Sequence, residues 1–262
     1  PEKVFVLVFT LDDPLLRMIP RLISMQCGIS INAVSNPIWK IQKNENLTSE
    51  QVDAYLKDRE FAINQLKEMS PSFMVKDETS EPNMNDLSVI GKTIQRFKEI
   101  ADRKQLVVMI DSLYNIDVHK NIDIRMKFME ISKTLKQFTT TYAIPIIGVC
   151  ELRKKEALGR KPHLEDIKEV VDLLYDANVG MLLFSELENK VNTELKFRDP
   201  AAEMDYPIVE LMVKKNKISG FKSSIFYKFY TEISRFEECS EEERRKYLGI
   251  SYARDQKKHL AG

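Results

Sequence analysis

The chain of 262 residues is long enough to bury one large α/β core or two smaller ones. Its 40 Lys and Arg balance its 40 Asp and Glu, so no global field favours DNA or a membrane surface, and any contact with nucleic acid must come from local patches. Three widely separated cysteines and three scattered histidines favour a reduced, cytoplasmic protein without a zinc site. No apolar run is long enough to span a bilayer, so we expect no membrane association.

Four continuous apolar runs, at residues 4–11, 106–111, 144–150 and 179–186, predict strands buried on both faces, as in a parallel sheet. Helical patterns lie between them, at about 14–27, 48–69, 86–103, 123–142 and 164–175. This alternation predicts an α/β fold, a mostly parallel sheet flanked by helices. Residues 207–238 instead indicate a C-terminal antiparallel hairpin with a Lys-rich tip. We expect one domain over 1–238, followed by a charged tail over 239–262 that forms a short helix and a loose end.

The residues Gly91, Lys92 and Thr93 spell the end of a phosphate-binding P-loop, whose full pattern is G-x-x-x-x-G-K-[ST] after a buried strand. The position of the first glycine holds Asp86, whose carboxylate would repel a phosphate, and polar residues 77–86 replace the strand. Apolar side chains recur here at helical spacing instead. The sequence therefore predicts an amphipathic helix with a coincidental GKT. Its apolar positions are Leu87, Ile90, Ile94, Phe97 and Ile100.

Two of the apolar runs end in carboxylates. Asp111 closes the run 106–111 in the manner of a Walker-B strand, where the carboxylate can hold Mg²⁺ through water; a turn-starting Asp is the alternative. Asp12 and Asp13 follow the run 4–11, and one of them could polarise an attacking water as a general base. Because Asp13 precedes Pro14, it is interpreted as the N-cap of the next helix, and the role of Asp12 stays open.

Further candidates are a strand-end acid and a pair of lysines. Glu151 follows the third run, where a polar residue can sense a γ-phosphate or simply mark the strand end. Lys215 and Lys217, at the hairpin tip, could reach phosphates of a nucleotide or of DNA; alternatively, they keep an edge strand from aggregating. We interpret the single Trp39 as a packed loop residue rather than a platform for stacked bases.

In order and spacing, these elements resemble the motor domain of DnaB-type replicative helicases, a RecA-like ATPase, up to about residue 238. The stretch "VLVFTLDDP" is similar to the family's F-S-L-E-M-S, which places Asp12 at the catalytic glutamate. "LVVMIDSLYNI" is similar to V-I-D-Y-L-Q-L, with Asp111 as the magnesium-associated residue. The stretch "IPIIGVCELRK" ends like V-P-V-I-A-L-S-Q-L-N-R and places Glu151 at the γ-phosphate-sensing Gln. "VELMVKKNKISG" places Lys215 and Lys217 where the family has its Lys and its arginine finger.

The resemblance implies that ATP and Mg²⁺ bind between subunits of a homo-oligomer, a hexameric ring, and that hydrolysis moves loops along single-stranded DNA during replication. Asp12 would then be the general base, Asp111 would help to hold Mg²⁺, and Lys215 and Lys217 would reach a neighbour's phosphate. A primase or a helicase loader would be a further partner. The implied DNA-facing residues are Arg153, Lys154, Lys155, Arg160, Lys161, Lys168 and Glu169.

Several phosphate-contacting positions depart from the family pattern. The P-loop is not in the sequence, Asp12 is one methylene shorter than Glu, Glu151 replaces a neutral Gln, and Lys217 lacks the planar fork of Arg. Two hypotheses therefore stand. One is an ATP-driven helicase motor whose P-loop strand lies upstream of Pro1. The other is a degenerate RecA-like protein that binds DNA or partners without hydrolysing nucleotide. A RecA-type ATPase of recombination or signalling is a third reading.

Overall fold

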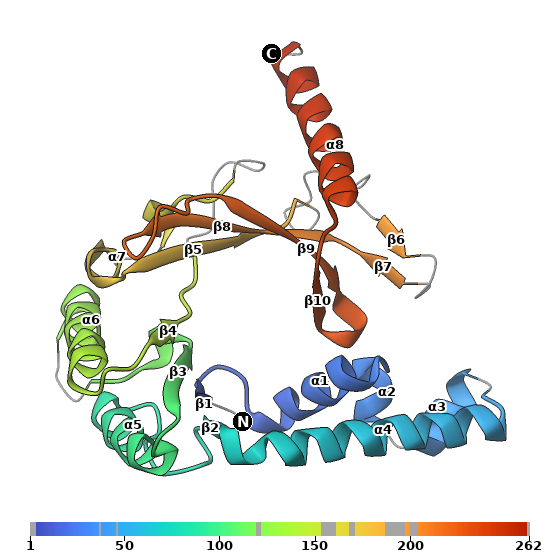
Figure 1. The fold of residues 1–262 in the computed structure, drawn as a ribbon, viewed down its shortest axis with the longest axis horizontal. Coiled ribbons are helices and arrows are strands. Elements are labelled where there is room, and N and C mark those ends of the chain that lie inside the picture. The colour runs from blue at the N-terminus through green and yellow to red at the C-terminus, as the bar shows by residue number, and fades with distance from the viewer. Residues whose placement is uncertain are drawn as a thin grey trace. The chain divides into compact units, whose positions relative to one another are not determined.

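The computed structural model describes residues 4–36, 38–45, 47–118, 122–152, 161–167, 171–186, 197–199 and 204–260. The chain divides into two compact units (Figure 1). The first unit comprises Pro1–Arg153 and Ile167–Ala177, and the second comprises Lys154–Asp166 and Asn178–Gly262. Among the described residues, no helix combines the length and the apolar character needed to cross a membrane.

The first unit is built on a parallel sheet of four strands in the order β2-β1-β3-β4. The strands predicted for three apolar runs are confirmed, although β4 is shorter than the run that contains it. The strand β2 was not predicted, because its five residues include Lys76 and lead directly into a polar loop. The strands are β1 (Val4–Thr10), β2 (Phe73–Asp77), β3 (Gln105–Asp111) and β4 (Ile146–Gly148).

Helices lie on both sides of this sheet, with α5 and α6 on one side and α1 to α4 on the other (Figure 1). The main core joins the apolar side chains of β1 and β3 to those of α5 and α6. A smaller cluster of Ile23, Val34 and Ala62 packs α1, α2 and α4 together. The helices are α1 (Leu15–Cys27), α2 (Ile31–Ser35), α3 (Ile38–Glu45), α4 (Ser49–Met69), α5 (Leu87–Ala101), α6 (Ile124–Thr141) and α7 (Val171–Asp176).

Four of the five predicted helices are confirmed, and two local expectations are wrong. Residues 164–175 do not form one helix, because Leu164–Asp166 is a 3₁₀ turn in the second unit and α7 begins only at Val171. Trp39 lies in α3, not in a loop, and it is 65% exposed rather than packed. The helices α2 and α3 were missed because each is short.

The GKT sequence lies inside α5, as predicted. Gly91 is buried, and a β-carbon at this position would lie 2.6 Å from Cζ of Phe138 on α6, so the glycine permits close helix packing. Asp86 is the N-cap, and its Oδ1 accepts hydrogen bonds from the backbone N–H groups of Ser88 (2.8 Å) and Val89 (3.3 Å). Lys92 is exposed on the helix surface.

The second unit is built on an antiparallel sheet in the order β10-β9-β8-β5. The predicted C-terminal hairpin is confirmed as β8 and β9. The expectation of a parallel strand at 179–186 is wrong, because β5 pairs antiparallel to β8. The strands are β5 (Val179–Phe184), β8 (Ile208–Asn216), β9 (Ser224–Tyr230) and β10 (Arg235–Glu238), with a separate pair of β6 (Phe197–Asp199) and β7 (Met204–Tyr206).

The helix α8 (Glu241–Leu260) is longer than the short helix expected for the C-terminal stretch. Its first part packs on the second unit, where Tyr247 is buried with Phe226 and the guanidinium of Arg244 lies over the Phe226 ring. Lys228 of β9 forms an ion pair with Glu243 (3.2 Å). Burial lowers the pKa of Lys228, but the hydrogen bond that its ammonium group donates to Glu243 and nearby negative charges outweigh this and raise the pKa above its ordinary value.

Because α5 is a capped surface helix rather than a nucleotide loop, we expect Asp86→Ala to lower the free energy of unfolding by about 1–2 kcal/mol. Lys92→Ala, on the exposed face, should change it by less than about 0.5 kcal/mol. Urea unfolding followed by circular dichroism measures both. A loss of nucleotide affinity on Lys92→Ala without a change in stability would contradict the helix interpretation.

Candidate functional site

Three predicted site residues follow neighbouring strands of the first unit. Thr10 at the end of β1 is in register with Asp77 of β2 and with Asp111 of β3. Asp12 comes two residues after β1, and Glu151 three residues after β4, the neighbour of β3. Because the carboxyl ends of parallel strands meet at one edge of a sheet, Asp12, Asp111 and Glu151 lie along the edge where such sheets bind ligands, here called the acidic edge.

Asp111 is a half-buried carboxylate close to other negative charges. Burial raises its pKa above the ordinary value, and the charges of Asp12 and Asp13 raise it further. The backbone here is fixed, since the N–H of Leu11 donates to the carbonyl of Asp111 (2.5 Å). Burial and neighbouring negative charges disfavour the ionised form of this carboxyl group. A carboxyl group in such surroundings, at the ligand-binding edge of a sheet, is typical of a functional site.

Asp12 and Asp13 have different surroundings. Asp12 is exposed, and its Oδ1 accepts a hydrogen bond from the side-chain amide of Asn115 (3.3 Å). Asp13 forms ion pairs with Arg21 (2.8 Å) and Arg17 (3.6 Å) on α1. The prediction that Asp13 caps α1 is wrong, because the side chain bonded to the first N–H of the helix belongs to Asp77, whose Oδ2 accepts from Leu15 at 2.9 Å.

Glu151 is exposed, and the stretch before it continues the pairing of β4 with β3. The N–H of Val149 donates to the carbonyl of Ile110 (2.9 Å), and the N–H of Leu113 donates to the carbonyl of Val149 (3.0 Å). Neighbouring Cys150 is half-buried, and burial raises the pKa of its thiol to about 11. A thiol of this kind is protonated at neutral pH, so Cys150 adds no charge to this strand end.

The two lysines of the hairpin belong to the second unit. Lys215 is half-buried on β8 opposite Gly180 of β5, and Lys217 is exposed at the start of the tip, where its N–H donates to the carbonyl of Asn178 (2.8 Å). Asn216 organises the tip, because its Oδ1 accepts from the N–H groups of Ile218 (2.9 Å) and Ser219 (3.0 Å). Lys217 is thus presented on a defined turn.

Of the residues predicted to face DNA, Lys161 is described, and Arg153, Lys154, Lys155, Arg160, Lys168 and Glu169 lie outside the described residues. The ammonium group of Lys161 lies 2.5 Å from Oε2 of Glu210, a carboxylate buried in β8. The other oxygen of Glu210 accepts from the hydroxyl of Ser224 on β9 (2.6 Å). The charge of Lys161 therefore compensates a buried anion, a role that sequence reasoning did not anticipate.

The carboxylate oxygens at the edge of the first unit suit Mg²⁺ that keeps most of its water ligands. Mg²⁺ in nucleotide sites keeps several waters and takes one or two carboxylates together with substrate phosphates. Asp111 and Asp12 can supply those carboxylates, whereas the described residues contain no group of three or more His, Cys, Asp or Glu placed to hold an ion alone. The residues present fit a hydrated Mg²⁺ that arrives with a nucleotide.

Two residues at this edge were missed by sequence reasoning. Asp77 ends the unpredicted strand β2, and Asn115 closes the 3₁₀ turn Leu113–Asn115 after β3. A signal for Asp77 existed, because an Asp followed at two and three positions by Thr79 and Ser80 is typical of a turn in which the carboxylate accepts local hydrogen bonds. For Asn115 the sequence carries no comparable signal.

Two solved structures share this fold. One of them, described as an ATPase domain, matches with a TM-score of 0.73 and 20% identity, over 90% of this chain and 75% of that chain. A DnaB-like replicative helicase, described with its interactions with primase, matches with a TM-score of 0.72 and 20% identity, over 90% of this chain and 52% of that chain. The fold predicted from the sequence is confirmed: it is that of RecA-like helicase domains.

The family follows from the sequence match. Residues 1–238 match the family described as DnaB-like helicase C terminal domain, and the chain belongs to that family. A curated relative, the replicative DNA helicase DnaB of Mycoplasma pneumoniae, is 26% identical over 152 residues. That match covers 57% of this chain and 30% of the relative, so it spans less than a third of the relative's length.

The raised pKa of Asp111 predicts how stability depends on pH. A carboxyl whose pKa is higher in the folded than in the unfolded protein stabilises the fold below its ordinary pKa, and this contribution is lost as the pH rises through the folded value. We expect Asp111→Asn to raise the unfolding midpoint at pH 7, with a gain that shrinks toward about pH 4. Thermal unfolding at several pH values measures this.

The control for this prediction is Asp53→Asn, which removes an exposed carboxylate on α4 away from the acidic edge. It should give no such pH-dependent gain. A lower midpoint for Asp111→Asn at pH 7 than for the unmodified protein would contradict the electrostatic account of this site.

The ion pair of Lys161 predicts a structural effect of its removal. Lys161→Ala leaves the buried Glu210 without its cation, and we expect a loss of about 1–3 kcal/mol in the free energy of unfolding. The exposed tip residue Lys222 supplies the matched control, Lys222→Ala, with a change of less than about 0.5 kcal/mol. Weaker DNA binding by Lys161→Ala at unchanged stability would instead assign this lysine to DNA.

Proposed function

We propose that this chain is an ATP-driven DNA helicase motor domain, spanning residues 1–238, that acts on single-stranded DNA in replication. The observation that carries the proposal is the placement of Asp12 and Asp111 at the ends of two paired parallel strands, with a raised pKa at Asp111. Membership of the DnaB-like helicase C-terminal domain family supports the same reading. The charged segment 239–262, much of it α8, is then an appendage of the motor.

In this proposal each acidic side chain at the edge has a separate task. Asp12, exposed and held by Asn115, accepts the proton of the attacking water as general base. Asp111 would help to hold Mg²⁺, and that ion, when bound with ATP, would neutralise phosphate charge. Glu151 occupies the sensor position after β4. Because a carboxylate repels a γ-phosphate, it has to be protonated or paired with a cation when ATP is bound.

The lysines of the second unit act on phosphates in the same scheme. Lys215 and Lys217 are proposed to reach the nucleotide of a neighbouring copy in a homo-oligomeric, hexameric ring, with Asn216 fixing the direction of Lys217. A lysine is a point charge and lacks the bidentate geometry of an arginine finger, so its contribution to the rate is smaller. Single-stranded DNA, and a primase or a helicase loader, are the proposed partners, in the cytoplasm.

The edges of the two sheets support a strand in addition to those described. Within the described residues β4 pairs only with β3, and Ile147 on it is 46% exposed. Likewise β5 pairs only with β8, and it exposes Met181 and Leu183, the latter at 61%. Long apolar edges are costly in water and prone to aggregate. A further strand at such an edge, for example that of a P-loop, would satisfy its unpaired backbone groups.

The second candidate is a degenerate RecA-like protein that binds DNA or partners without hydrolysis. It is favoured by Glu151 and Lys217, which weaken two phosphate contacts. The two candidates differ in one measurable property, the hydrolysis of ATP by the natural protein.

The deciding experiment measures ATP hydrolysis with Mg²⁺ by the natural protein, including any segment before Pro1, with and without single-stranded DNA. We expect a rate stimulated by DNA that falls at least about 100-fold on Asp12→Asn. Lys217→Ala should also abolish the stimulated rate, whereas Lys217→Arg should preserve it and Lys222→Ala should leave it unchanged. No hydrolysis above background, with DNA binding intact, would refute the motor and leave the degenerate protein.

A further inference from the structure

The turn that carries Asp12 is attached to the sheet on two sides. This acidic turn comprises residues 11–15, from the residue after β1 to the first residue of α1. A short exposed turn would ordinarily let its side chains adopt several positions. Here one end of the turn is bonded to Asn115, in the 3₁₀ turn after β3, and the other end to Asp77, the last residue of β2.

On the β3 side the attachment is Asn115. Its side-chain NH₂ group donates to the carbonyl of Leu11 (2.9 Å) and to Oδ1 of Asp12 (3.3 Å). The N–H of Leu11 in turn donates to the carbonyl of Asp111 (2.5 Å). One amide group therefore contacts both the backbone that leads into the turn and the carboxylate that the turn displays. Because the amide donates to Oδ1, it fixes which oxygen of the Asp12 carboxylate is occupied.

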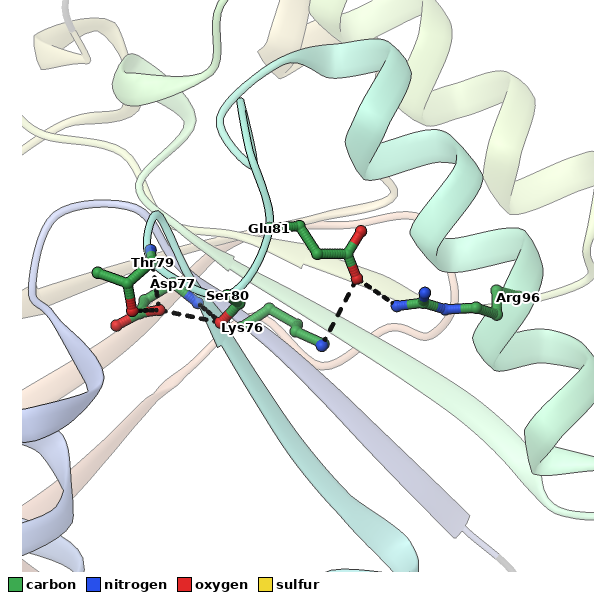
Figure 2. A network of polar contacts seen from close by, with 6 residues as sticks. All are labelled: Lys76, Asp77, Thr79, Ser80, Glu81 and Arg96. Atoms are coloured by element: carbon green, nitrogen blue, oxygen red, sulfur yellow. Dashed lines mark hydrogen bonds and ion pairs between the residues drawn. The ribbon is translucent and has the colours of Figure 1, made fainter.

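On the β2 side the attachment is Asp77, which is only 4% exposed. Its Oδ2 accepts from the N–H of Leu15 (2.9 Å), the last residue of the turn. Its Oδ1 accepts from the N–H (3.1 Å) and hydroxyl (2.7 Å) of Thr79 and from the hydroxyl of Ser80 (2.9 Å), as Figure 2 shows for the side chains. Burial raises the pKa of Asp77, but these hydrogen bonds outweigh it and hold the pKa below its ordinary value.

The loop that supports Asp77 is itself held in place. Glu81 lies between two cations, Lys76 of β2 (3.7 Å) and Arg96 of α5 (2.5 Å), as Figure 2 shows. The two cations neutralise Glu81 and tie the loop after β2 to the helix that covers the sheet. Asp77 is thus a rigid, ionised group at the N-terminus of α1, where the helix dipole favours negative charge.

The turn itself contains a residue, Asp13, that could cap α1 from within, and the structure does not use it. Asp13 lies next to the start of α1, yet its carboxylate is directed to Arg17 and Arg21. A cap from within the turn would stabilise the helix but leave the turn free to move over the sheet. A cap from β2 fixes the turn to the strand that is in register with Thr10.

We propose that Asn115 and Asp77 are positioning residues for Asp12, holding the acidic turn between β3 and β2 so that its carboxylate keeps one direction. This role rests on the proposed function of Asp12 as general base. A base that is displaced by about 1 Å loses on the order of 100-fold in rate, so residues that fix the turn have a large effect on turnover and a small one on nucleotide binding.

The test compares three buried or turn-facing side chains in the natural protein. Asp77→Asn is a sharp probe, because the N–H groups of Leu15 and Thr79 bond to different oxygens, and either orientation of the amide turns its NH₂ toward one of them. Asp86→Asn is the matched control, because Ser88 and Val89 both donate to the same oxygen, which an Asn retains. Asn115→Ala removes the other attachment, and Asn115→Gln keeps an amide for partial rescue.

We expect Asp77→Asn and Asn115→Ala to lower kcat for ATP by about 10–100-fold with KM unchanged, and Asp86→Asn to leave both unchanged. Amide hydrogen exchange at Leu15 should accelerate in Asp77→Asn. Accelerated exchange with unchanged kcat would overturn the proposal, and so would an equal loss of kcat in Asp86→Asn. If the unmodified protein does not hydrolyse ATP, the proposed function is refuted. Unchanged exchange at Leu15 in Asp77→Asn would instead show that Asp77 does not hold the turn.

Discussion

The parallel pairing of β1 with β3 is the constraint on which the first unit depends. Seven consecutive residues of each strand are in register, from Val4 opposite Gln105 to Thr10 opposite Asp111. Their apolar side chains form the centre of the core, and Phe9, Leu106 and Ile110 are completely buried. Such a strand cannot shift by one residue without turning its buried set to the opposite face. The pairing therefore determines where Asp12 and Asp111 emerge, and the acidic edge is a consequence of the core.

The sequence predicted those elements of the fold whose hydrophobic pattern is long and regular. Long apolar runs and long amphipathic helices, such as β1, β3, α5 and α6, were predicted within a few residues because burial alone specifies them. The strand β2 was missed because it is short and polar at its end, and Asp77 was missed with it. The pairing of β5 was misassigned because an apolar run indicates burial but not the direction of its neighbour.

The candidate site was predictable only in its strand-end residues. Asp12, Asp111 and Glu151 could be named because each follows an apolar run, a local feature of the sequence. The residues that hold the turn of Asp12 are remote along the chain: Asn115 lies 103 residues from Asp12, and Asp77 lies 62 residues from Leu15. Contacts of this kind depend on the tertiary fold, and a single sequence offers no spacing rule from which they could be derived. The cap of α1 is a further example, because Asp13 was predicted from its position in the sequence, whereas the tertiary fold supplies Asp77.

Negative charge is concentrated at the acidic edge, and this limits what can bind there. Asp12, Asp13 and Asp111 lie close enough for their charges to raise the pKa of Asp111, and Glu151 adds a further carboxylate along the same edge. Arg17 and Arg21 compensate Asp13, which leaves Asp12 and Asp111 as the carboxylates available to a cation. A nucleotide brings additional negative charge, so binding here requires positive charge that these strand ends do not supply. In the proposed function Mg²⁺ and the hairpin lysines would provide this positive charge. The residues Glu151 and Lys217 would then bear more directly on catalysis than any change in the core.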